Sequence, residues 1–128
     1  MNIPIFRAKK ECDGEYIEFK TYFEEDGKYR AIIKFAKQEV DGWLDSVYIP
    51  LTFRIDPTTL TIHFPDMLDS QGNKIFASLS ASGKGGDIMK DDEYYGIAKY
   101  VDCKFVVEYE NCFDGIDEGN FEAIGIHE

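Results

Sequence analysis

Residues 15–35 read EYIEFKTYFEEDGKYRAIIKF and contain two runs in which apolar and polar side chains alternate. The second run ends with Ile33 and Phe35, which we expect to face inward while the lysines and arginines between the apolar positions face outward. Alternation with a period of two is typical of a strand with one buried face. Asp26-Gly27 separates the runs, and glycine accepts the positive φ that a tight hairpin turn requires. The stretch therefore predicts a β-hairpin.

Similar short apolar alternations continue through the rest of the chain, and they predict a mostly-β fold, either all-β or α+β with little helix. They occupy residues 47–53, 60–64, 95–97, 105–109 and 121–126. Pro50 lacks a backbone donor, so it predicts an edge strand or a break at its position. Residues 32–40 also fit one or two helical turns, although the strand pattern overlaps them.

Turn signals separate these segments. Asp41-Gly42 is a second hairpin candidate, and residues 56–59 predict a turn or the start of a very short helix because proline is tolerated there. Residues 69–74 read as a surface turn. Residues 77–86 are rich in serine and glycine and predict a flexible loop. We expect one domain over residues 1–128, with two lobes, about 1–64 and 86–128, as the alternative.

Length and composition indicate a globular chain that stays in the cytoplasm. The 128 residues correspond to about one domain, and aromatic residues make up 15% of them. No apolar run approaches the ~20 residues that span a bilayer, and the N-terminal residues lack the pattern of a signal peptide. Three widely spaced cysteines without a Cys-x-x-Cys motif favour reduced thiols over a zinc site or a disulfide framework. We expect no cofactor.

The negative charge is concentrated in the C-terminal half. Residues 1–64 hold 9 Lys/Arg and 11 Asp/Glu, whereas residues 65–128 hold 5 and 14, within a formal net charge of −11. Such a surface repels phosphate backbones, so direct binding of nucleic acid is disfavoured unless a local basic patch exists. Arg7, Lys9 and Lys10 form a short basic cluster, which we interpret as a charged strand end.

Several segments resemble the YopX family of phage and prophage proteins. They are Ile55–Leu60, Leu68–Phe76, Gly86–Met89, Gly96–Tyr100, Lys104–Glu108 and Phe121–Ile126, and the start Ile5–Ala8 is similar to the family's N-terminal segment. The chain departs from the family pattern where residues 77–85 interrupt a stretch that is usually contiguous. The resemblance implies a phage or prophage origin, a bacterial host cytoplasm and a homo-oligomer. It also implies a small SH3-like or barrel-like C-terminal unit, which would follow the N-terminal hairpins that the alternation and the turn signals predict. The resemblance transfers no catalytic residue.

Recognisable catalytic motifs are absent from the sequence. Gly83-Lys84-Gly85-Gly86 lacks the spacing of a phosphate-binding loop, and residues 114–120 do not match a calcium loop. We expect His63 on the outer face of a strand and His127 at the terminus, neither with a nucleophile beside it. The candidate interaction residues are acidic side chains expected to be solvated, together with one aromatic: Asp87, Asp91, Asp92, Glu93, Asp114, Asp117, Glu118 and Trp43.

Three functions remain open at this point. The favoured interpretation is a non-catalytic protein-interaction or self-assembling β module, because closed barrels and oligomers hide the edges of short strands. The first alternative is an acidic decoy that imitates the charge of nucleic acid toward a host protein. The second is a metal-dependent hydrolase that uses the acidic loops. The expected partner is a protein, either another copy or a host or phage protein.

Overall fold

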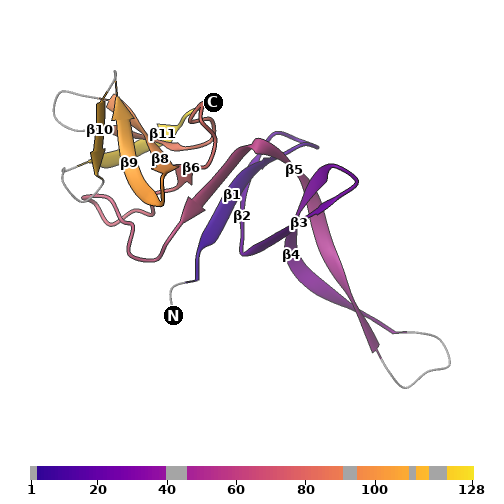
Figure 1. The fold of residues 1–128 in the computed structure, drawn as a ribbon. Coiled ribbons are helices and arrows are strands. Elements are labelled where there is room, and N and C mark those ends of the chain that lie inside the picture. Colours follow the sequence, from indigo (N-terminus) through magenta and orange to yellow (C-terminus); the bar gives the residue numbers. More distant parts are fainter. Residues whose placement is uncertain (1–2, 40–45, 91–94, 110–111, 116–120) are drawn as a thin grey trace.

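The computed structural model describes residues 3–39, 46–90, 95–109, 112–115 and 121–128 (Figure 1). Every regular element in these ranges is a β-strand, which confirms the mostly-β prediction. The strands are β1 (Ile5–Lys10), β2 (Tyr16–Phe19), β3 (Thr21–Glu25), β4 (Lys28–Glu39), β5 (Ser46–His63), β6 (Ala77–Ser78), β7 (Asp87–Lys90), β8 (Tyr95–Val101), β9 (Lys104–Tyr109), β10 (Cys112–Gly115) and β11 (Glu122–Ile126).

The predicted hairpin is present as β3 and β4. Glu25 pairs with Lys28, and the two residues between them have positive φ, 52° at Asp26 and 75° at Gly27. Two consecutive residues with positive φ match the twist of the flanking strands, which explains the choice of Asp-Gly here. The helical alternative for residues 32–40 is wrong, because β4 continues as a strand through Glu39.

A bulge in β4 overturns part of the predicted facing pattern. Ile32 pairs with Thr52 and Lys34 pairs with Leu51, so Ile33 is an extra residue without a partner on β5. A one-residue insertion moves every later side chain to the opposite face. The expectation that Ile33 and Phe35 face inward is therefore wrong, and both side chains are exposed.

The segment at residues 56–59 forms a wide bulge within β5 rather than a helix. Arg7 of β1 pairs with Thr61, whereas Lys9 pairs with Asp56, so four residues of β5 stand opposite one residue of β1. Asp56 accepts hydrogen bonds from the amide and the hydroxyl of Thr58, at 3.0 and 2.7 Å. Figure 1 shows β5 bending between its long first part and its last residues.

The C-terminal strands form a small, curled, barrel-like sheet beside the end of β5 (Figure 1). The strand order runs β10-β9-β8-β6-β5-β1-β2, while β7 bridges β8 and β11. All its pairings are antiparallel except that between β6 and β8. The SH3-like part of the expectation stays a prediction.

Two clusters of buried apolar side chains lie at different places in the chain. One contains Ala8, Phe19, Ala31, Ile55 and Leu60 from the N-terminal strands. The other contains Ile75, Ala77, Met89, Ala98, Val107 and Phe121 from the barrel-like sheet. Residues 77–86 begin with β6 and lie against this second unit, with Ser78, Gly85 and Gly86 buried and Leu79, Ala81 and Ser82 exposed. The flexibility expected for this segment stays a prediction.

His63 is buried rather than on an outer face. The residue is 2% exposed, and its ring Nδ1 lies 2.9 Å from the carbonyl oxygen of Ile75. A carbonyl only accepts, so Nδ1 carries the proton that is donated. The prediction failed because β1 and β6 flank the last residues of β5 and other side chains cover both of its faces, leaving no solvent side.

Asp69 closes the turn at residues 69–74, which is confirmed as a turn. Its carboxylate accepts hydrogen bonds from the amides of Gln71, Asn73 and Ala123, at 2.9, 2.7 and 2.9 Å. Burial acts to raise the pKa of Asp69, but these hydrogen bonds favour the charged form more strongly and hold the pKa below its usual value of 3.8.

We expect the Asp69 carboxylate to make stability depend on pH in acid. A carboxyl group with a lowered folded-state pKa contributes stability above its unfolded-state pKa, and this contribution is lost as the pH falls through the folded-state value. Urea unfolding of the wild type and of Asp69→Asn between pH 6 and pH 2 should therefore show a smaller acid-induced loss in the variant. Parallel curves for the two proteins would contradict this account.

Candidate interaction surface on the β4–β5 ribbon

Residues 28–39 of β4 and 46–55 of β5 form a ribbon that projects from the molecule (Figure 1). Strand β3 borders residues 28–32 of β4, and beyond them the described part of the ribbon is two-stranded. Pairing runs from Tyr29 opposite Ile55 to Glu39 opposite Ser46. Pro50 pairs with Phe35 near the middle of the projecting part, where β4 is the only strand beside β5 among the described residues. The edge position predicted for Pro50 is therefore confirmed, while the predicted break is not.

One face of the ribbon continues the N-terminal core outward. Tyr29 and Ile55 pair on the core side, and the period of two places Leu51 and Ile49 on the same side of β5. Leu51 and Ile49 are nevertheless 41% and 45% exposed, because no described strand covers them. The apolar face thus extends beyond the body that it helps to fold.

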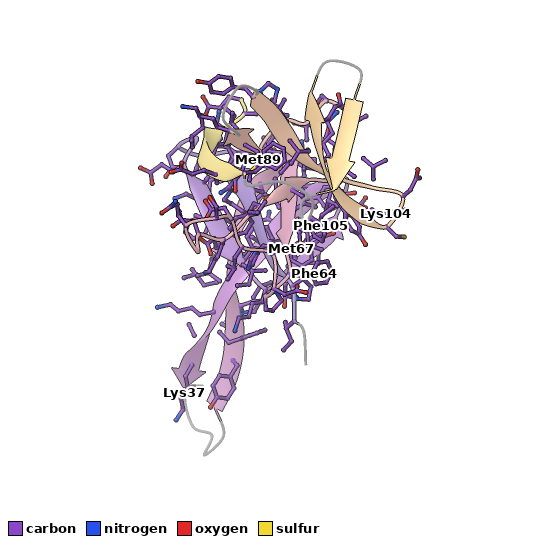
Figure 2. The ribbon with its side chains drawn as sticks, turned by 90° about the vertical axis from the view of Figure 1, so that its left-hand side faces the viewer. Lys37, Phe64, Met67, Met89, Lys104 and Phe105 are labelled. Carbon is purple, nitrogen blue, oxygen red and sulfur yellow. The ribbon has the colours of Figure 1, made fainter. Side chains whose placement is uncertain are left out.

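The opposite face carries aromatic side chains. Phe35 pairs with Pro50 and Lys37 pairs with Tyr48, so these four residues point to one side. Phe35 is 59% exposed and Tyr48 is 63% exposed. Figure 2 shows Lys37 near the far end of the ribbon, away from the body. Apolar groups are therefore open to solvent on both faces, which makes the ribbon a candidate interaction surface.

The ribbon differs in charge from the rest of the molecule. Residues 28–39 and 46–55 carry five basic side chains and one acidic side chain, and residues 40–45 between them add two acidic residues. Residues 28–55 together therefore have a formal charge of +2, whereas the rest of the chain has 9 Lys/Arg and 22 Asp/Glu, a charge of −13. The basic residues of the ribbon are Lys28, Arg30, Lys34, Lys37 and Arg54.

Asp87 does not belong to an exposed acidic surface. Its carboxylate is buried, with Oδ1 2.7 Å from Arg7 Nη2, and Oδ2 accepts a hydrogen bond from the amide of Phe76 at 2.9 Å. The expectation of a solvated carboxylate is wrong here because Arg7, in β1, closes over the start of β7. Asp87 ties two parts of the fold together.

The other candidate interaction residues are not brought together by described geometry. Asp114 lies in β10, opposite Val107 of β9. Asp91, Asp92, Glu93, Trp43, Asp117 and Glu118 lie outside the described residues. Within the part of the chain that is described, no three His, Cys, Asp or Glu side chains are placed to share a metal ion. The same part holds no helix long and apolar enough to cross a membrane.

The basic character of the ribbon could have been predicted from the sequence, although the larger number of acidic residues in the loops drew the prediction to them. Residues 28–37 hold four basic and no acidic residues between apolar ones, in a chain with a net charge of −11. What the sequence did not show is that this hairpin leaves the body. No protein-family model, curated protein or solved structure matches the chain. The resemblance to the YopX family stays a prediction.

Proposed function

We propose that this protein is a non-catalytic, self-assembling β module, in which the ribbon of one copy docks on the acidic body of a second copy. The observation that carries the proposal is the uncovered continuation of the core face along the ribbon, at Leu51 and Ile49. Apolar surface removed from water contributes about 25 cal/mol per Å², so covering this face stabilises an assembly.

The charge distribution supports a second copy as the occupant. The ribbon is the basic part of a chain whose remaining residues have a formal charge of −13. Opposite charges on the two contacting surfaces steer association and fix its orientation. Reciprocal docking of two ribbons would give a closed dimer, whereas one-way docking would give a ring or a chain of copies.

The YopX resemblance is consistent with this proposal, because it implies a homo-oligomer from a phage or prophage. A basic ribbon with aromatic side chains could also enter a groove of DNA, which is the competing possibility. The acidic body disfavours DNA binding, because its negative charge repels the phosphate backbone. Self-assembly therefore takes precedence, and duplex binding becomes an outcome of the test.

We expect the double variant Ile49→Ser with Leu51→Ser to weaken self-association about 30-fold or more, because two partly buried aliphatic side chains would be lost from the contact. Sedimentation velocity over a range of protein concentrations, at low and high salt, measures this change. Ile3→Ser is the matched control, since Ile3 is 53% exposed and precedes β1, whose charged residues are all basic, so it lies outside both the ribbon and an acidic docking face. It should assemble as the wild type does.

A wild-type protein that stays monomeric at every concentration would overturn self-assembly. If that monomer bound a labelled DNA duplex and the ribbon variant did not, the ribbon would be a nucleic-acid-binding element. Weaker assembly at high salt is expected as well, because the proposed contact joins surfaces of opposite charge.

A further inference from the structure

A small pocket lies on the barrel-like sheet, away from the ribbon and unused by the proposed function. Its volume is about 290 Å³, and it is lined by Phe64, Asp66, Met67, Tyr100, Cys103 and Phe105. Figure 2 shows Phe64, Met67 and Phe105 side by side, although Phe105 comes from β9 and the other two follow β5. The rings are partly buried, and Asp66 is exposed at the edge.

The fold holds the aromatic walls in place. Tyr100 and Phe105 pair across β8 and β9, so their rings share one face, with centroids 4.8 Å apart. The amide of Met67 donates a hydrogen bond to the carbonyl of Phe64 at 2.9 Å, which forms a turn directly after β5. The Phe64 ring stands at 87° to that of Phe105, with centroids 5.5 Å apart. Two nearly perpendicular rings thus form a corner.

Strained backbone brings a further group to the rim. Val101 pairs with Lys104, and the two residues between them have positive φ, 51° at Asp102 and 62° at Cys103. Positive φ at a cysteine is uncommon, because its Cβ crowds the backbone there. This tight turn places Cys103 in the pocket wall, while the exposed neighbour Lys104 does not line it.

The electrostatics of the pocket favour a positive ligand. Aromatic faces are negative and attract ammonium groups, and the effect grows as the cation loses water. The one charged side chain in the lining is the carboxylate of Asp66. Residues 65–128 carry 5 Lys/Arg and 14 Asp/Glu, a field that raises the local concentration of cations.

We propose that this pocket binds an alkylammonium group, whose methyl or methylene shell lies against the wall formed by the rings of Phe64, Tyr100 and Phe105, with Asp66 as the counter-charge. A neutral apolar molecule of the same shape would gain the contacts with the rings and lose both electrostatic contributions. An anion would meet the carboxylate and the ring faces unfavourably. The shape, the rings and the charge therefore agree on one class of ligand.

Choline and its neutral isostere 3,3-dimethylbutan-1-ol test the proposal by NMR titration of the labelled protein. We expect choline to shift the signals of Met67, Tyr100 and Phe105 and to bind at least about fivefold more tightly than the isostere. Asp66→Asn should weaken choline binding about fivefold and leave the isostere unchanged. Asp26→Asn, in the exposed β3–β4 turn, removes the same charge elsewhere and serves as the control.

Equal affinities for choline and the isostere would overturn the proposal in favour of a purely apolar pocket. An equal effect of Asp66→Asn and Asp26→Asn would overturn the role of Asp66 and leave only the net charge of the chain. The absence of shifts with either molecule would show that the pocket binds neither. None of these outcomes depends on the oligomeric state, so self-assembly and cation binding are judged separately.

Discussion

Replacing Asp87 with alanine is expected to lower the free energy of unfolding by about 3–5 kcal/mol, because it leaves a buried charge without its partner. The side chains of Asp87 and Arg7 are 6% and 12% exposed, and their closest atoms are 2.7 Å apart. The change also removes the acceptor for the amide of Phe76 at 2.9 Å. Urea unfolding of the two proteins measures the difference.

After Asp87→Ala, Arg7 cannot turn toward solvent without breaking its remaining contacts. Its guanidinium carbon lies 4.4 Å from the centre of the Phe76 ring, and Nη2 also donates to the carbonyl of Gly85 at 3.0 Å. Arg7 belongs to β1 and Asp87 to β7, so the pair joins the two parts of the fold. We therefore expect Asp87→Ala to loosen the packing of the barrel-like sheet against β1.

Two further variants separate the buried pair from an ordinary loss of charge. Glu18→Ala breaks a half-exposed pair with Lys74, whose closest atoms are 3.4 Å apart, and should cost less than about 1 kcal/mol. The double variant Arg7→Met with Asp87→Leu should recover part of the loss, since it leaves no unpaired charge. A loss for Asp87→Ala no larger than that for Glu18→Ala would contradict this role.

The features that the sequence predicted correctly depend on neighbours along the chain. The β3–β4 hairpin was predictable because Asp26-Gly27 supplies the positive φ values and the alternation on both sides sets the strands. The turn at residues 69–74 was predictable for the same kind of reason, since Asp69 bonds to amides two and four residues ahead. In both cases the determining contacts span only a few residues.

The features that the sequence did not predict depend on distant contacts or on a single inserted residue. Arg7 and Asp87 are 80 residues apart, so nothing local distinguished Asp87 from the other acidic residues. The bulge at Ile33 leaves the alternation of the sequence intact and still exposes Phe35. The ribbon projects because no further described strand pairs with its outer part. The alternation of apolar and polar residues predicts a strand but not which neighbours that strand has.

Replacing Gly85 with alanine is expected to be the second strongly destabilising change, with a loss of about 2–5 kcal/mol from backbone strain and overpacking together. Gly85 has a φ of +84°, and a Cβ there would lie 2.3 Å from the carbonyl oxygen of Thr59. Either the loop that holds Gly85 or the β5 bulge that holds Thr59 would have to move, because a carbon and an oxygen atom that are not bonded do not approach so closely.

Hydrogen bonds hold both of these segments in place. Thr59 lies in the wide bulge of β5, where its hydroxyl donates to the carbonyl of Asp56 at 2.6 Å and accepts from the amide of Lys9 at 2.9 Å. On the other side, the amide of Gly85 donates to the carbonyl of His127 at 2.6 Å. Relief of the clash would therefore break hydrogen bonds on β1 or at the end of the chain.

Gly72→Ala provides a control with the same backbone strain and no clash. Gly72 has a φ of +83°, and a Cβ there would meet nothing within 4 Å, so this variant should lose only about 1–2 kcal/mol. The difference between the two variants in urea unfolding then measures the close approach of Gly85 to β5. Equal losses of stability for Gly85→Ala and Gly72→Ala would mean that the β5 bulge moves at little cost. They would contradict the tight packing of Gly85 against Thr59.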